Sequence, residues 1–164
     1  MQKGTCIDLF AGCGGLSLGL HTSGHWHGLF AVEKSPDAFA TLQHNLIDSH
    51  CHFSWPTWLS QTPHAIDHIL ADHRHNLLKL RGQVDLVAGG PPCQGFSMAG
   101  RRCESDDRNR MVQSYLKIVE LVRPRVLLFE NVRGFLVGFR GEGGNRGIPP
   151  SQSVLDKLRL LGYS

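Results

Sequence analysis

The sequence predicts an α/β fold in which a mostly parallel sheet carries helices on both faces. Three observations predict it. Short apolar runs alternate with amphipathic stretches, glycine-rich turns follow the ends of apolar runs, and the amphipathic stretches are long enough to return the chain to a parallel neighbour. With 41 % hydrophobic and 19 % charged residues, the composition is typical of a soluble globular domain. No apolar run approaches the ~18 residues that indicate a membrane span.

The first part of the chain is predicted to form a βαβ unit. Residues 5–10 form an apolar run typical of a buried strand, and the glycines within 11–15 predict a tight turn. Residues 16–22 then predict a helix, and residues 28–32 a second strand. Pro36 suits the first turn of the helix that follows. This order places the two strands side by side and parallel.

The remainder alternates less regularly. Residues 47–81 are rich in His, Trp and Pro and predict only one helix, near 65–80. Residues 134–150 are rich in Gly and Arg and are expected to form a mobile loop. The other elements expected here are strands over 84–88 and 126–130, a helix over 111–122, and a helix over 154–161 that ends at Gly162.

Charge and cysteine content narrow the class of protein. The net charge is +3, with five Lys/Arg against seven Asp/Glu up to Gly90 and twelve against seven from Pro91 onward. The basic second half fits a solvated surface and a nucleic-acid contact equally well. Five cysteines without a C-x-x-C pair favour free thiols in a reducing compartment over disulfides or a zinc site. We therefore expect an intracellular, cytoplasmic protein without a metal.

The first candidate site is the glycine turn after the first strand. Glycines there let a ligand approach the backbone and the amino end of the next helix. Ser17 occupies the position where the G-x-G-x-x-G fingerprint requires its last glycine, which argues against NAD or FAD. Glu33, at the end of the second strand, could accept the ribose hydroxyls of an adenosine or be a surface carboxylate. Phe10 could pack in the core or against an adenine ring.

The second and third candidate sites follow the later strands. Cys93 comes after two prolines at a strand end, a position that presents a thiol rather than burying it. A nucleophilic role requires help in forming the thiolate, because a free thiol is only a few per cent ionised at pH 7. Glu130 ends the strand 126–130. We expect its carboxylate to be buried, with a raised pKa that makes it a proton donor.

Five segments of the chain form a recognisable set: residues 8–20, 32–34, 90–97, 107–109 and 130–132. Together they resemble the catalytic domain of the carbon-5 cytosine-specific DNA methyltransferases. They occur in the order found in that family, and the Pro-Cys-Gln and Glu-Asn-Val segments are highly specific. The resemblance implies a Rossmann-like methyltransferase fold that binds S-adenosyl-L-methionine.

The resemblance also implies roles for individual residues. Cys93 is implied to attack carbon-6 of cytosine, and Glu130 to contact ring nitrogen-3 and the amino group. Gln94 and Ser97 are implied to belong to a loop that closes on a flipped base, and Asn131 to brace that loop. The residues implied to bind S-adenosyl-L-methionine are Phe10, Gly12, Gly14, Gly15, Leu16, Glu33, Lys34, Asp72 and Pro92.

Members of the resembling family also carry an arginine-rich base-contacting strand, a target-recognition domain and a C-terminal segment that completes the cofactor pocket. We interpret residues 1–164 as the cofactor-binding and catalytic subdomain only. Its implied partners are double-stranded DNA and a complementing C-terminal chain, with neither membrane nor metal, and it is expected to be inactive alone. Two alternatives stay open: an S-adenosylmethionine-binding remnant or split-enzyme half without turnover, and an RNA cytosine methyltransferase of the same family.

Overall fold

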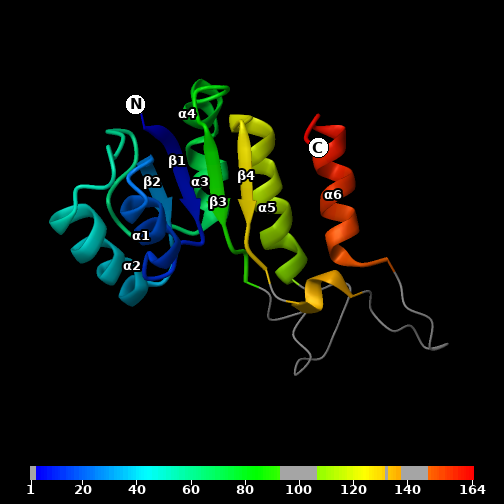
Figure 1. Cartoon of the computed structure of the whole chain (residues 1–164), viewed down its shortest axis with the longest axis horizontal. Helices are drawn as coiled ribbons and strands as arrows, with labels where there is room; N and C mark the ends of the chain where they lie inside the picture. Colours follow the sequence, from blue (N-terminus) through cyan, green and yellow to red (C-terminus); the bar gives the residue numbers. More distant parts are fainter. Residues whose placement is uncertain (1–2, 93–106, 132, 138–147) are drawn as a thin grey trace.

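The computed structural model describes residues 3–92, 107–131, 133–137 and 148–164 (Figure 1). Within these ranges the chain forms one parallel sheet in the strand order β2-β1-β3-β4. The elements are β1 (Gly4–Leu9), α1 (Gly15–Thr22), β2 (Trp26–Val32), α2 (Pro36–Leu42), the π-helix η1 (Gln43–Ser49), α3 (Ile66–Asp72), α4 (Arg74–Lys79), β3 (Leu86–Gly89), α5 (Asp107–Val122), β4 (Val126–Phe129), the 3₁₀-helix η2 (Arg133–Leu136) and α6 (Pro150–Leu160).

The four strands end together at one edge of the sheet. In β1, Leu9 pairs with Val32 of β2 and with Gly89 of β3, and Gly89 in turn pairs with Phe129 of β4. Because all pairs are parallel, the residues after each strand emerge at the same edge. Ligands of open α/β sheets bind at this carboxyl edge. The register therefore brings together segments that are up to 120 positions apart in the sequence.

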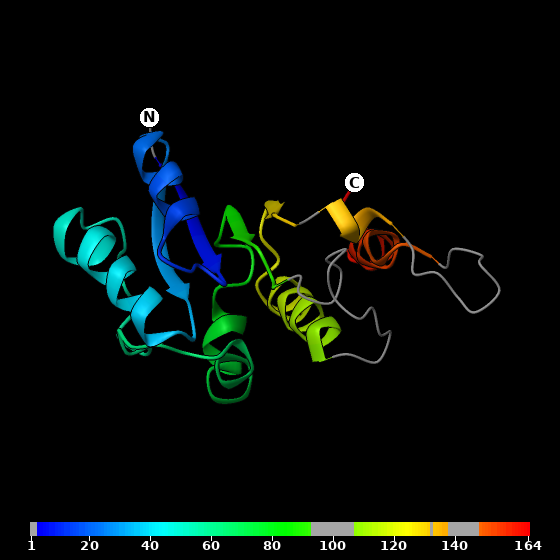
Figure 2. The same ribbon diagram turned by 90° about the horizontal axis from the view of Figure 1, so that it is seen from below.

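Helices cover both faces of the sheet, as the sequence predicts (Figure 2). On one face, Ile7 and Val87 pack in a cluster with α5 residues such as Tyr115. On the other face, Cys6 and Ala88 pack beneath α1, where they contact Leu16 and Leu20. Side chains alternate between the two faces along each strand, so both faces of β1 and β3 are buried. Their continuous apolar runs follow from this double burial.

The face of β4 that lies beside the α1 layer is not covered by the described residues. Val126 and Leu128 are paired with Leu86 and Ala88, which α1 covers, yet they are 53 % and 42 % exposed. In Figure 1, α1 lies over β1 and β2, toward the edge of the sheet that is opposite β4. An uncovered apolar surface of this kind indicates a contact with further polypeptide or an aggregation hazard.

Within residues 47–81, a short segment pairs with the outer edge of β2, and two separate helices, α3 and α4, follow it. Gly28 of β2 donates its N–H to the carbonyl of His52, and the N–H of Ser54 donates to the carbonyl of Gly28. The ring of Phe53 lies so close to Gly28 that no side chain fits there. The single helix predicted over 65–80 is wrong, because the backbone leaves helical geometry at His73 and separates α3 from α4.

The C-terminal elements also differ in part from the prediction. Residues 133–136 form the 3₁₀-helix η2, which overlaps the start of the loop expected over 134–150, and residues 138–147 lie outside the described ranges. Helix α6 begins at Pro150, four residues earlier than predicted. Its predicted end is confirmed, since Gly162 has a left-handed backbone (φ 84°) and donates its N–H to the carbonyl of Arg159.

Candidate active site

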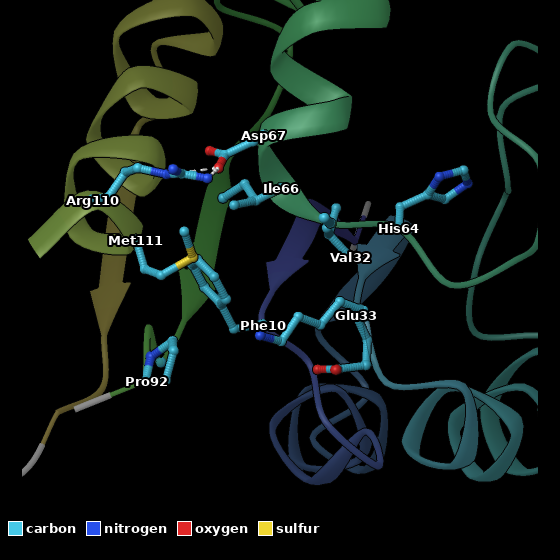
Figure 3. A pocket seen from close by; sticks show the side chains of 12 residues that line it. Phe10, Val32, Glu33, His64, Ile66, Asp67, Pro92, Arg110 and Met111 are labelled. Carbon is cyan, nitrogen blue, oxygen red and sulfur yellow. Dashed lines mark hydrogen bonds and ion pairs between the residues drawn. The ribbon is translucent and has the colours of Figure 1, made fainter. Parts of the chain in front are cut away.

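A cavity of about 340 Å³ opens at the carboxyl edge of the sheet (Figure 3). Segments that follow β1, β2 and β3 contribute to its wall, and the first turns of α3 and α5 close it from the helix side. Its size lies within the range of small-molecule sites. The residues that line it are Phe10, Val32, Glu33, Lys34, His64, Ala65, Ile66, Asp67, Gly90, Pro92, Arg110 and Met111.

Phe10 supplies part of the apolar wall from an unusual backbone conformation. Its φ of 59° lies in the left-handed region, which costs a bulky residue roughly 1–2 kcal/mol. This conformation turns the chain sharply out of β1, and the next residue, Ala11, donates its N–H to the carbonyl of Val32. In Figure 3 the Phe10 ring and the Met111 side chain point into the same space, with Ile66 above them. Aromatic and aliphatic walls of this kind suit a flat heteroaromatic ring.

Glu33 provides a carboxylate whose orientation is set by backbone donors. Its Oε2 accepts the N–H of Gly12 at 2.9 Å, and its Oε1 accepts the N–H of Ser35 at 2.7 Å. Glu33 is half-buried and lines the cavity. Each oxygen retains a lone pair that could accept a ligand hydroxyl.

The glycine turn is tightly constrained. Gly12 and Gly14 both have left-handed backbones, with φ of 55° and 89°. A Cβ at Gly14 would lie 2.7 Å from the side chain of Leu46 in η1. The turn thus fits closely between β1 and the α2–η1 layer, and a larger residue would move it away from Glu33.

Asp8 holds the amino end of α1 from within the sheet. It is buried, and its Oδ2 accepts the hydroxyl of Ser17 at 2.6 Å. Burial raises the pKa of Asp8 to about 6, against the lowering effect of the hydrogen bonds from the Ser17 side chain and backbone. Sequence analysis assigned Asp8 no role. The available signal was a carboxylate inside an otherwise apolar strand.

We expect Asp8→Asn to stabilise the fold at neutral pH. Because the folded-state pKa of Asp8 is raised, its protonation favours the folded state at low pH, and this contribution is lost as the pH rises from about 4 through about 6. The asparagine variant should therefore be more stable at pH 7.5 by on the order of 2–3 kcal/mol, with little difference at pH 4. Urea unfolding at both pH values measures this. A variant less stable than the parent at pH 7.5 would contradict it.

Glu130 follows β4 and lies against the loop after β3. Its N–H donates to the carbonyl of Gly89 at 2.9 Å, and a Cβ on Gly90 would lie 2.6 Å from its Oε2. The predicted burial of Glu130 is wrong, because the residue is exposed. It shares the face of Val126 and Leu128, which no described element covers, so burial would require polypeptide beyond the described residues. Asn131 is half-buried beside it.

The structure brings together only some of the residues that the resemblance implies. Phe10, Glu33, Lys34 and Pro92 line the cavity, and Gly12 is bonded to Glu33. Gly14 and Gly15 shape the turn into α1 without lining the cavity, and Leu16 packs in the cluster beneath α1. The predicted residues that lie outside the described ranges are Cys93, Gln94 and Ser97.

Asp67, rather than Asp72, is the second carboxylate of the cavity. Asp72 is exposed at the last residue of α3 and does not line the cavity, whereas Asp67 lies in the first turn of α3 and does. The hydrogen bond from Ser114 and those from Arg110 hold the pKa of Asp67 below its usual value, although partial burial opposes this. Asp67 and Arg110 were not predicted as site residues, since nothing local to either residue indicates the other.

Among the described residues, no group of three or more His, Cys, Asp or Glu side chains could hold a metal ion. No helix there is both long and apolar enough to cross a membrane.

Comparison with known proteins identifies the family. The model of the C-5 cytosine-specific DNA methylases matches residues 4–164. Type II methyltransferase M1.HphI of Haemophilus parahaemolyticus is 39 % identical over 162 residues, which are 97 % of this chain and 38 % of that protein. Type II methyltransferase M.XorII of Xanthomonas oryzae pv. oryzae is 35 % identical over 139 residues, or 84 % of this chain and 30 % of that protein. The chain thus spans about a third of the length of these relatives.

A structural comparison supports the fold independently. The crystal structure of the S. pombe Dnmt2 methyltransferase superposes with a TM-score of 0.64 at 19 % identity, covering 99 % of this chain and 42 % of that one. The parallel sheet with helices on both faces is therefore the Rossmann-like fold of S-adenosylmethionine-dependent methyltransferases. From the family match along nearly its whole length, the chain belongs to the C-5 cytosine-specific DNA methylases.

Proposed function

We propose that the cavity binds S-adenosyl-L-methionine and that residues 1–164 are the cofactor-binding and catalytic subdomain of a DNA (cytosine-5-)-methyltransferase. The observation that carries the proposal is the backbone-anchored Glu33 carboxylate beside an apolar slot at the carboxyl edge of the sheet. S-adenosyl-L-methionine fits the residues that line this cavity. Its adenine ring would enter the slot beside Phe10 and Met111, and its ribose hydroxyls would donate to Glu33.

The other proposed cofactor residues line the cavity or set the position of the glycine turn. Lys34 and Pro92 line the cavity, and the left-handed glycines keep the turn close to Glu33. Gly15 and Leu16 form the first turn of α1, whose N–H groups favour a negative ligand group such as a carboxylate. Asp72 does not line the cavity, whereas Asp67 does and would lie near the adenine ring.

For the chemical step, we propose Cys93 as the nucleophile. Cys93 is the next residue in the sequence after Pro92, which lines the cavity. The thiolate would form a bond to carbon-6 of a cytosine turned out of the duplex, which makes carbon-5 nucleophilic. The bound cofactor supplies the methyl group. Loss of the carbon-5 proton then permits elimination, which releases the thiolate from carbon-6.

Further residues are proposed to hold the base. Glu130 lies against Gly90, and from there its carboxylate could contact ring nitrogen-3 and the amino group of the cytosine. Asn131 is the next residue and would brace the loop that contains Cys93. Gln94 and Ser97 would belong to the part of that loop that closes over the base.

We propose double-stranded DNA as the substrate and a complementing C-terminal polypeptide as a partner. The 164-residue chain alone is expected to transfer no methyl groups, because the described residues leave apolar side chains of β4 exposed and base flipping needs contacts that hold the duplex. Adding the downstream polypeptide of a relative should restore transfer of tritiated methyl groups to duplex DNA. Structured RNA serves as the comparison substrate. Transfer to RNA without transfer to DNA would contradict the proposed substrate. Transfer to DNA by the 164-residue chain without the added polypeptide would contradict the need for a partner.

A further inference from the structure

Asp67 and Arg110 form an ion pair at the wall of the cavity, at the other end from Glu33 in Figure 3. The Nε and Nη2 of Arg110 both donate to Oδ2 of Asp67, at 3.0 and 2.6 Å. The buried hydroxyl of Ser114 donates to Oδ1 at 2.6 Å. The pair joins the first turn of α3 to the start of α5, although the two residues are 43 positions apart in the sequence.

The two partners are unequally exposed. The Arg110 side chain is 63 % exposed and that of Asp67 only 32 %. An ion pair this accessible to water contributes little to the stability of the unliganded chain, typically 0–1 kcal/mol. Asp67, however, lines the cavity, so a ligand that fills the cavity would cover part of its remaining exposed surface. A carboxylate that is covered without a counter-ion is strongly unfavourable.

We propose that Arg110 is a positioning residue for the cofactor: it is the resident counter-ion that allows the Asp67 carboxylate to be covered when the cavity fills. The inference rests on the proposed function, because it requires the cofactor to occupy this cavity. According to the proposal, the Asp67–Arg110 ion pair stabilises the liganded state more than the unliganded state. Loss of Arg110 should therefore reduce affinity for the ligand while leaving folding nearly unchanged.

The test is calorimetric titration of the 164-residue chain with S-adenosylhomocysteine, together with thermal unfolding without ligand. Arg110→Met should weaken binding on the order of tenfold, with the thermal midpoint within a few degrees of the parent. The double variant Asp67→Asn with Arg110→Met should regain most of this affinity, because no charged group is then covered alone. The matched control is Arg125→Met, which removes an exposed arginine from its ion pair with Asp85 at the opposite end of the strands. It should bind like the parent.

The outcomes separate the inference from the proposed function. A parent chain that does not bind S-adenosylhomocysteine would overturn the proposed function, and the inference with it. A parent that binds, with an Arg110→Met variant of equal affinity, would overturn only the inference. A double variant as weak as Arg110→Met would also overturn it, because Arg110 would then act by shaping the cavity rather than by neutralising Asp67.

Discussion

Replacement of Cys93 by alanine is expected to lower the rate of methyl transfer on the order of 10⁴-fold or more. The rate is measured with the chain supplied with the downstream polypeptide of a relative. Without the thiolate no bond forms to carbon-6, and carbon-5 of cytosine is then too weak a nucleophile to accept the methyl group. The same variant should no longer be trapped on DNA that contains 5-fluorocytosine. In the parent enzyme, fluorine replaces the proton whose removal precedes release, so the covalent complex persists and survives denaturing electrophoresis.

The matched control for Cys93→Ala is Cys51→Ala. Cys51 is an exposed free thiol that does not line the cavity, so its removal should leave both methyl transfer and trapping unchanged. A covalent complex that still forms with Cys93→Ala would refute the assignment of the nucleophile. Trapping lost in Cys51→Ala would instead identify Cys51 as the attacking thiol.

Replacement of Glu33 by alanine should weaken cofactor binding about tenfold to a hundredfold. The proposed ribose contacts are hydrogen bonds to a charged acceptor, which contribute roughly 1.5–3 kcal/mol. The same carboxylate accepts the N–H groups of Gly12 and Ser35, so its loss also releases the glycine turn. Calorimetry with S-adenosylhomocysteine measures the effect. Glu33→Gln, whose amide keeps one acceptor oxygen, should be intermediate.

Asp37→Asn is the matched control for Glu33. Asp37 is an exposed carboxylate in the first turn of α2, and it does not line the cavity. Its removal changes the charge near the site without removing a proposed ligand contact. If Asp37→Asn weakened binding as much as Glu33→Ala, the loss would reflect general charge and not a ribose contact. Unchanged affinity in Glu33→Ala would contradict the proposed contact between Glu33 and the ribose.

The sequence predicted well the features that depend on local pattern. The strands, the glycine turn and the positions of Phe10 and Glu33 depend on apolar periodicity and on spacing within one βαβ unit. Because parallel strands end at one edge, the meeting of Phe10, Glu33 and Pro92 follows from the order of elements alone. The α/β class with a mostly parallel sheet followed from the same observations, whereas the Rossmann-like methyltransferase fold was implied by the family resemblance.

Features that depend on long-range packing could not be predicted. The Asp67–Arg110 pair joins two helices far apart in the sequence, so neither residue indicated the other and Asp72 was chosen instead. The backbone break at His73 had no Gly or Pro signal. The burial predicted for Glu130 rested on its position at the end of an apolar strand, whereas this face of β4 is exposed in the described part of the chain.

The most direct test of the central claim is a crystal structure of the chain with S-adenosylhomocysteine. We predict density for the ligand in the cavity at the carboxyl edge, with the adenine between Phe10 and Met111 and both ribose hydroxyls within hydrogen-bond distance of the Glu33 carboxylate. Ligand density elsewhere on the molecule, or a ribose that makes no contact with Glu33, would contradict the account.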